Sequence, residues 1–126
     1  MKKRQVFKQV AQHLLDQNKR AEYFARVDED DSCRYHMDGG IKCAVGCLIS
    51  DEHYDETLEG RDIEDMRVRK AVELSLGQRI TAKDLKLLND LQILHDYQPV
   101  DGWHRMLDEM ALLHFNKDLV DLGVKV

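Results

Sequence analysis

Three cysteines and one histidine gather in a short stretch of the chain and are the residues best suited to chemistry. Cys33 and His36 precede Cys43 and Cys47, so six residues separate two pairs of ligand-type side chains. Thiolates and imidazoles are groups that zinc prefers, and four of them can form a tetrahedral site. The spacing matches no standard zinc module, and buried free cysteine commonly behaves as a small apolar residue. We therefore expect the cysteines to pack in the core without a cofactor, and keep zinc as the alternative.

Cys43 also allows a nucleophile hypothesis. It immediately precedes the apolar segment 44–49, which is long enough for about two turns of helix. A thiol at a helix N-terminus has a lowered pKa, and a histidine from elsewhere in the fold would complete the plan of papain-like hydrolases. None of the six histidines has a local signature of a base. We therefore favour a protein that is not an enzyme, with a cysteine-dependent enzyme as the alternative.

Acidic residues dominate the middle third of the sequence. Residues 28–65 carry three Lys and Arg against thirteen Asp and Glu, a net charge of -10, whereas residues 1–27 have a net charge of +5. Such a run is most often a solvated face, but it can also attract a basic partner. We expect the polar loop or short helix at 50–56 to form a partner-binding surface. Its carboxylates are Asp51, Glu52, Asp55 and Glu56.

Other functional motifs are missing from the sequence. Asp28-x-Asp30-x-Ser32 begins like a calcium loop, but Cys33 occupies the position of the required glycine. No glycine-rich phosphate-binding motif is present. The acidic middle third disfavours nucleic acid, and no apolar run approaches the roughly 20 residues of a membrane span. We expect neither a nucleic-acid nor a membrane partner.

The elements that must position these residues are mostly helices. Apolar residues recur at helical spacing over 4–17, and Asn18 is a plausible stop. Asp62 can cap a further helix, which Gly77 would end. High charge with little proline supports the same fold class.

The second half of the chain supplies the most apolar helix. It spans 82–97, opened by a capping arrangement of Thr81 and Asp84, and its several apolar stripes make it the central helix. A last helix starts near Asp101. Its periodicity places His114 in the core as a hydrogen-bonded residue, whereas His95 lies near a helix end beside Asp96.

The cysteine segment itself predicts a β-hairpin followed by a short helix. Asp38-Gly39-Gly40 tolerates the positive φ of a hairpin turn, so we expect a hairpin over about 33–43 that leads into a short central helix. Gly46 in that helix indicates the close approach of another backbone. The predicted fold is mainly α, a compact single domain over residues 1–126 with about four to five helices.

Composition also indicates a compartment. The N-terminus is basic, but Val6-Phe7-Lys8-Gln9-Val10 is too polar for the core of a signal peptide. An odd number of cysteines argues against a disulfide framework. We expect a cytoplasmic protein with reduced thiols.

Residues 40–49, Gly-Ile-Lys-Cys-Ala-Val-Gly-Cys-Leu-Ile, resemble a motif of small proteins from tailed phages and bacteria. The resemblance spans about residues 5–115. It also rests on Cys33-x-Tyr35, Asp51-Glu52-His53-Tyr54, Glu59-Gly60, Leu88-x2-Leu91-Gln92-x2-His95-Asp96 and Trp103. It implies a phage or bacterial genomic context and no particular activity.

Small acidic phage-type proteins without an enzyme signature often act by binding a host protein. We therefore expect a small soluble accessory protein that binds a host or phage protein in a regulatory or inhibitory role, as in host takeover or defence suppression. The acidic middle third favours a basic partner. The alternative is a cysteine-dependent enzyme or a zinc-stabilised module centred on residues 33–47.

Overall fold

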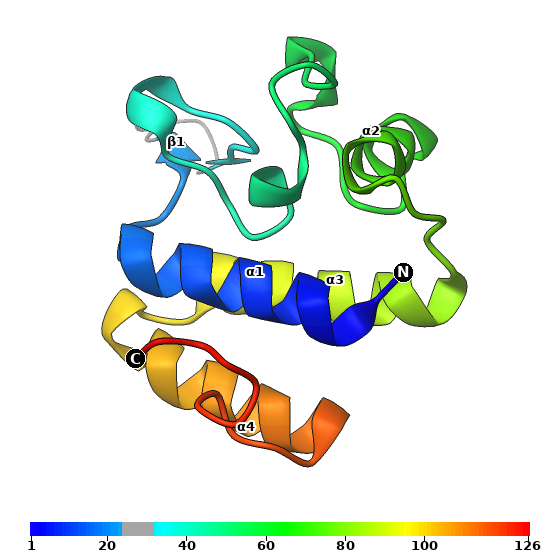
Figure 1. The fold of residues 1–126 in the computed structure, drawn as a ribbon. Coiled ribbons are helices and arrows are strands. Elements are labelled where there is room, and N and C mark those ends of the chain that lie inside the picture. Colours follow the sequence, from blue (N-terminus) through cyan, green and yellow to red (C-terminus); the bar gives the residue numbers. More distant parts are fainter. Residues whose placement is uncertain (24–31) are drawn as a thin grey trace.

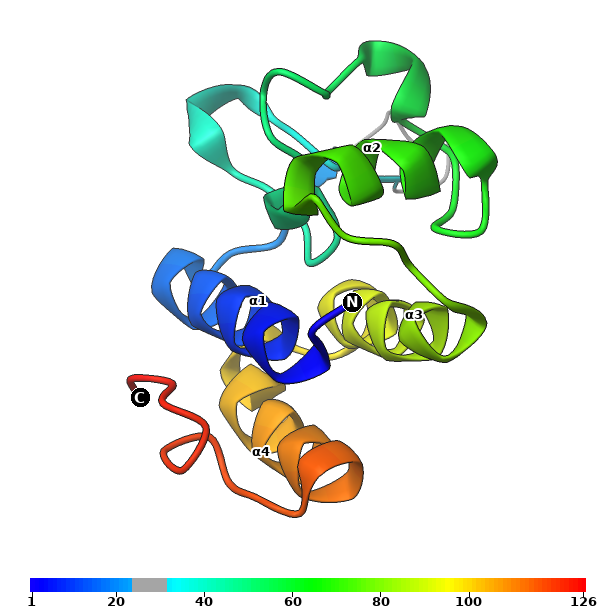
Figure 2. The ribbon, with the colours of Figure 1, turned by 45° about the vertical axis from the view of Figure 1, so that its right-hand side comes forward.

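Helices dominate the computed structural model, which describes residues 1–23 and 32–126. Helices α1 (Lys3–Gln17), α3 (Ala82–Tyr97) and α4 (Trp103–Phe115) form a three-helix bundle in which each contacts the other two. Helix α2 (Met66–Leu76) and the irregular segment before it lie on the other side of α1 and α3 from α4 (Figures 1 and 2). The prediction of a mainly helical, compact fold is confirmed.

Helix α1 follows its predicted pattern closely. Five apolar residues on one face are buried, among them Phe7 and Leu14. Asn18 ends the helix in the left-handed conformation, with φ +52°, and its N–H donates to the carbonyl of Leu14 at 2.9 Å. Asparagine tolerates this conformation better than most residues, which explains why the helix stops there.

Helix α3 begins with the capping box that its sequence predicts. The Thr81 N–H donates to the Asp84 carboxylate at 2.9 Å, and the Asp84 N–H donates to the Thr81 hydroxyl at 3.2 Å. Its buried leucines lie in the core, and the helix contacts both α1 and α4. Because α1 and α4 also contact each other, α3 is one of three mutually packed helices and not the central one. In the described part of the chain, no helix combines the length and the apolar character that crossing a membrane requires.

Helix α2 begins later than its sequence pattern suggests. Asp65, not Asp62, is the N-cap, and its carboxylate accepts from the Arg67 N–H at 2.9 Å. Asp62 caps the preceding turn by accepting from the backbone of Glu64. Gly77 ends the helix with φ +66°, as predicted.

Two histidines of the second half, His95 and His114, exchange their predicted roles. His95 is the buried one: its Nε2 accepts from the Ala21 N–H at 3.0 Å, and its Nδ1 lies 2.7 Å from the Asp96 carboxylate. His114 is only partly buried and pairs with Asp90 at 3.3 Å. A position near a helix end suggests exposure, but His95 is buried because distant residues pack on it: the ring of Trp103, the first residue of α4, has its centroid 5.4 Å from that of His95.

The predicted hairpin over 33–43 and the helix after it are wrong. Strand β2 (Ser32–Cys33) pairs instead with β1 (Glu22–Tyr23), and within the predicted hairpin one isolated bridge joins His36 to Lys42. The backbone N–H groups of Tyr35 and His36 donate to the Glu59 carboxylate at 2.8 and 3.2 Å. A side chain therefore provides the hydrogen-bond acceptors that a neighbouring strand would provide in a hairpin. A single 3-10 turn, Gly46–Leu48, replaces the helix.

Gly46 makes the close contact with another backbone that a glycine at this position predicts. A Cβ atom built at this position would lie 2.0 Å from the carbonyl oxygen of Tyr35. The turn at Gly46–Leu48 also contacts α1 and α2, so it connects the irregular segment to the bundle. Only glycine allows the backbones of residues 35 and 46 to approach this closely.

Replacing Gly46 with alanine should therefore destabilise the fold by about 3 kcal/mol or more, because the rigid backbone of Tyr35 must move. Gly102→Ala is the matched control, since nothing lies within 4 Å of its Cβ position and its φ is -95°. Urea unfolding of the two variants measures the difference. Equal stability of both variants would contradict the packing described here.

Candidate functional site

The two cysteines whose side chains the structure describes are packed, with their sulfur atoms hydrogen-bonded to nearby backbone. Cys43 is fully buried, and its Sγ accepts from the Gly46 N–H at 3.3 Å. The Cys47 thiol donates to the carbonyl of Ala44 at 3.1 Å. The third cysteine, Cys33, is also a predicted zinc ligand, and its side chain lies outside the described part of the structure. These contacts support the packing interpretation for Cys43 and Cys47.

His36 uses its ring nitrogens within the protein. Its Nε2 lies 2.9 Å from the carbonyl oxygens of both Gly46 and Ile49, so this nitrogen donates. Its Nδ1 lies 3.7 Å from the Asp51 carboxylate, and its ring stacks on Tyr54 with centroids 4.1 Å apart. Among the residues whose side chains are described, no three metal-ligating groups converge. Zinc binding stays a prediction.

The nucleophile hypothesis loses its geometric basis at Cys43. The predicted α-helix after this residue is replaced by the single 3-10 turn Gly46–Leu48, which is too short for an appreciable helix dipole, and the fully buried sulfur offers no access to a substrate. Cys47 and His13 line one hollow of about 530 Å³ on α1. Burial raises the pKa of the Cys47 thiol to about 12, and burial also lowers the pKa of His13. A thiol whose pKa is raised this far stays protonated near neutral pH and is a weak nucleophile.

The predicted partner-binding carboxylates are all exposed. Asp51 has 91% of its side-chain surface accessible, and Glu52 has 85%. Asp55 caps the 3-10 turn Glu56–Leu58 by accepting from the Thr57 N–H at 2.8 Å. We call these four residues, with the exposed Asp38, the acidic surface. Its members are Asp38, Asp51, Glu52, Asp55 and Glu56.

A polar pocket of about 400 Å³ opens within the acidic surface. Asp38 and Glu56 line it together with the stacked rings of His36 and Tyr54. Arg34 also lines it and lies 3.9 Å from the carboxylate of Glu59. The structure thus joins the histidine of the cysteine segment to the acidic residues, which sequence reasoning treated as separate sites.

Glu59 lies beneath this pocket and is the residue that sequence reasoning missed. Its largely buried carboxylate accepts from the backbone N–H groups of Tyr35 and His36 and from the Tyr54 hydroxyl at 2.6 Å. Burial raises the pKa of Tyr54, and the hydrogen bond to Glu59 raises it further. No local pattern could have identified Glu59, because its backbone partners lie 24 and 23 residues earlier.

No protein-family model, curated protein or solved structure matches the chain.

If Cys43 and Cys47 are packed in the core, their thiols should react slowly with a thiol reagent. In a Cys33→Ser variant, which leaves Cys43 and Cys47, folded protein at about pH 8 should react with Ellman's reagent at least roughly a hundredfold more slowly than protein unfolded in urea. The physical reasons are the burial of Cys43 and the raised pKa of Cys47. One fast thiol in the folded variant would contradict this. Near-stoichiometric zinc in the wild-type protein, measured by elemental mass spectrometry, would instead establish the metal site.

A second prediction concerns Glu59. Glu59→Gln should destabilise the protein by about 1–3 kcal/mol, because an amide nitrogen would face a buried backbone N–H. Glu56→Gln, the same change at an exposed neighbour, should alter stability by less than about 0.5 kcal/mol. Urea unfolding measures both. If charge repulsion within the acidic segment outweighed the hydrogen bonds, both substitutions would instead be stabilising.

Proposed function

We propose that this chain is a small phage-type accessory protein that binds a host or phage protein through its acidic surface. The role would be regulatory or inhibitory, and host takeover and suppression of a host defence are the processes it would serve. Two observations support the proposal: the resemblance of about residues 5–115 to small proteins from tailed phages and bacteria, and the exposed acidic surface.

The uncompensated charge of the acidic surface is the observation that carries the proposal. Residues 38–65 contain nine Asp and Glu against two Lys and Arg, a net charge of -7. Both cations already face carboxylates: Lys42 lies 3.8 Å from Asp51, and Arg61 lies 3.1 Å from Asp65. Within the described part of the chain, Asp38, Asp55 and Glu56 belong to no ion pair. A basic partner would relieve this repulsion and would be attracted at long range.

The polar pocket suggests how such a partner could be held. Asp38 and Glu56 offer carboxylates, and Tyr54 offers an aromatic ring, at the walls of a pocket of about 400 Å³. Carboxylates and aromatic rings are the groups that bind arginine and lysine side chains. Arg34 interacts with Glu59, which leaves Asp38 and Glu56 to a side chain of the partner. We infer that the partner inserts a cationic side chain there.

Charge reversal tests the proposal. The double variant Glu52→Lys/Glu56→Lys avoids Asp55, which caps a turn, and Asp51, which faces Lys42. In affinity capture from a bacterial host lysate followed by quantitative mass spectrometry, it should recover the partner about tenfold less than the wild type. Recovery by the wild type should also fall as salt is raised, because the attraction is electrostatic.

Asp101→Lys/Asp121→Lys provides the matched control, since it makes the same change in net charge at exposed carboxylates outside the acidic surface. It should recover the partner as the wild type does. Equal recovery by all three proteins, with unchanged melting temperatures, would rule out the acidic surface as the binding site. If both double variants recovered equally little partner, the loss would be due to net charge alone, and the acidic surface would not be the specific binding site.

A further inference from the structure

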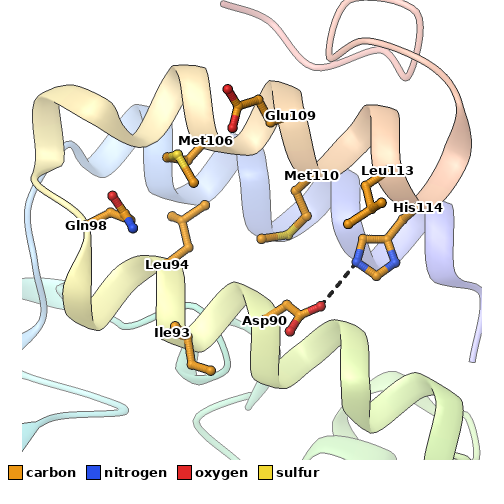
Figure 3. Close-up of a pocket in the computed structure, with 9 residues that line it drawn as sticks. All are labelled: Asp90, Ile93, Leu94, Gln98, Met106, Glu109, Met110, Leu113 and His114. Carbon is orange, nitrogen blue, oxygen red and sulfur yellow. Dashed lines mark hydrogen bonds and ion pairs between the residues drawn. The ribbon is translucent and has the colours of Figure 1, made fainter.

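An apolar groove runs between α3 and α4 on the side of these helices away from α1. Figure 3 shows it from the front, with α1 behind the two helices. The cavity measures about 350 Å³. Its apolar walls come from both helices and are Ile93, Leu94, Met106, Met110 and Leu113.

The groove exposes large apolar side chains to solvent. Leu113 is 82% exposed and Ile93 is 45% exposed, whereas Leu94 is only 3% exposed and forms the floor. The lining residues span 106–114 on α4 and 90–98 on α3, so the groove is about 13 Å long, or between two and three helical turns. A groove of this length beside a three-helix bundle can hold two turns of a further helix. Exposed apolar surface of this kind marks binding sites.

The polar residues of the groove are two carboxylates, an imidazole and an amide. Asp90 and His114 pair across one end at 3.3 Å, Gln98 lies at the other end, and Glu109 stands on the α4 edge (Figure 3). None of the nine lining residues is lysine or arginine. Glu109 also lies 3.5 Å from Arg105, but an exposed pair of this kind compensates the charge only weakly.

We propose that this groove binds an amphipathic helix of a protein partner, whose apolar stripe is flanked by lysine or arginine. A helix of this kind places apolar anchors at i, i+3, i+4 and i+7, which suits a groove with side chains from two helices. Met106 and Met110 can adapt to anchors of different shape because methionine is flexible and polarizable. The flanking cations would face Asp90 and Glu109.

Charge disfavours a second copy of this chain as the occupant. Two copies joined by these faces would bring Asp90 and Glu109 of one protomer against the same carboxylates of the other, and Arg105, beside the groove, already lies 3.5 Å from Glu109 of its own protomer. Like charges placed opposite each other are unfavourable at an interface. A partner with a basic rim meets no such penalty.

The groove is separate from the acidic surface and extends the proposed function. The acidic surface belongs to the irregular segment before α2, which lies on the other side of α1 and α3 from α4 (Figures 1 and 2). A partner helix in the groove and a cationic side chain in the polar pocket would therefore occupy different sides of the molecule.

A model peptide tests the proposal. The probe is a helix of roughly 14 residues, with leucines at i, i+3, i+4 and i+7 spacing and lysines on both flanks. Titrated into protein labelled at its methionine methyl groups, it should shift the NMR signals of Met106 and Met110 and leave that of Met66, on α2, unchanged. Met37 lines the polar pocket, so a shift of Met37 alone would show binding at the acidic surface and overturn the proposal.

Two controls separate charge from apolar contact. A peptide with glutamate in place of every lysine should bind at least about tenfold more weakly, and equal binding would overturn the preference for a basic helix. Leu113→Gln should weaken binding of the lysine peptide by a similar factor without changing the charge, whereas Met66→Gln, at an equally exposed residue on α2, should not. Sedimentation that shows a dimer in the wild type but not in Leu113→Gln would identify the groove as a contact between copies. Absence of any methyl shift up to about 1 mM peptide would also reject the proposal.

Discussion

The Glu59 carboxylate is the contact on which the irregular half of the molecule depends. Between β2 and α2 the chain has only single turns, so its backbone polar groups need partners from side chains. Glu59 supplies them for Tyr35 and His36 and also accepts from the Tyr54 hydroxyl. The Tyr35 hydroxyl in turn donates to the carbonyl of Arg61. One buried acceptor thus joins both ends of the segment that carries the acidic surface.

The same contact explains how an acidic segment can fold at all. Nine carboxylates in residues 38–65 repel one another, and a flexible loop would separate them. Glu59 turns one carboxylate inward, where it organises the backbone. The stack of His36 on Tyr54 and the hydrogen bonds from His36 to the carbonyls of Gly46 and Ile49 then join the loop to the turn Gly46–Leu48, and this turn contacts α1 of the bundle. The remaining carboxylates are presented outward by a rigid base, which lowers the entropic cost of binding.

The sequence predicts what local patterns determine and misses what distant contacts determine. Periodicity and caps identify α1 and α3 because the stop at Asn18 and the capping box at Thr81 act within one turn. The predicted hairpin does not form, and the N–H groups of Tyr35 and His36 donate instead to Glu59, more than 20 residues away. Cys43, His36 and Cys47 are close in sequence, yet the contact of Gly46 with Tyr35 directs their polar atoms to backbone groups rather than to one centre.

The two proposed binding surfaces differ in the forces that would act on them. At the acidic surface the attraction is mostly Coulombic and acts through solvent, so salt would screen it within about 10 Å at 0.1 M. In the groove, apolar side chains such as Leu113 and Ile93 leave water on binding, and that contribution does not weaken with added salt. Charge in the groove would then select the partner rather than hold it. A protein with both surfaces can be drawn to a basic partner at long range and retained by apolar contact, or can bridge two partners on opposite sides.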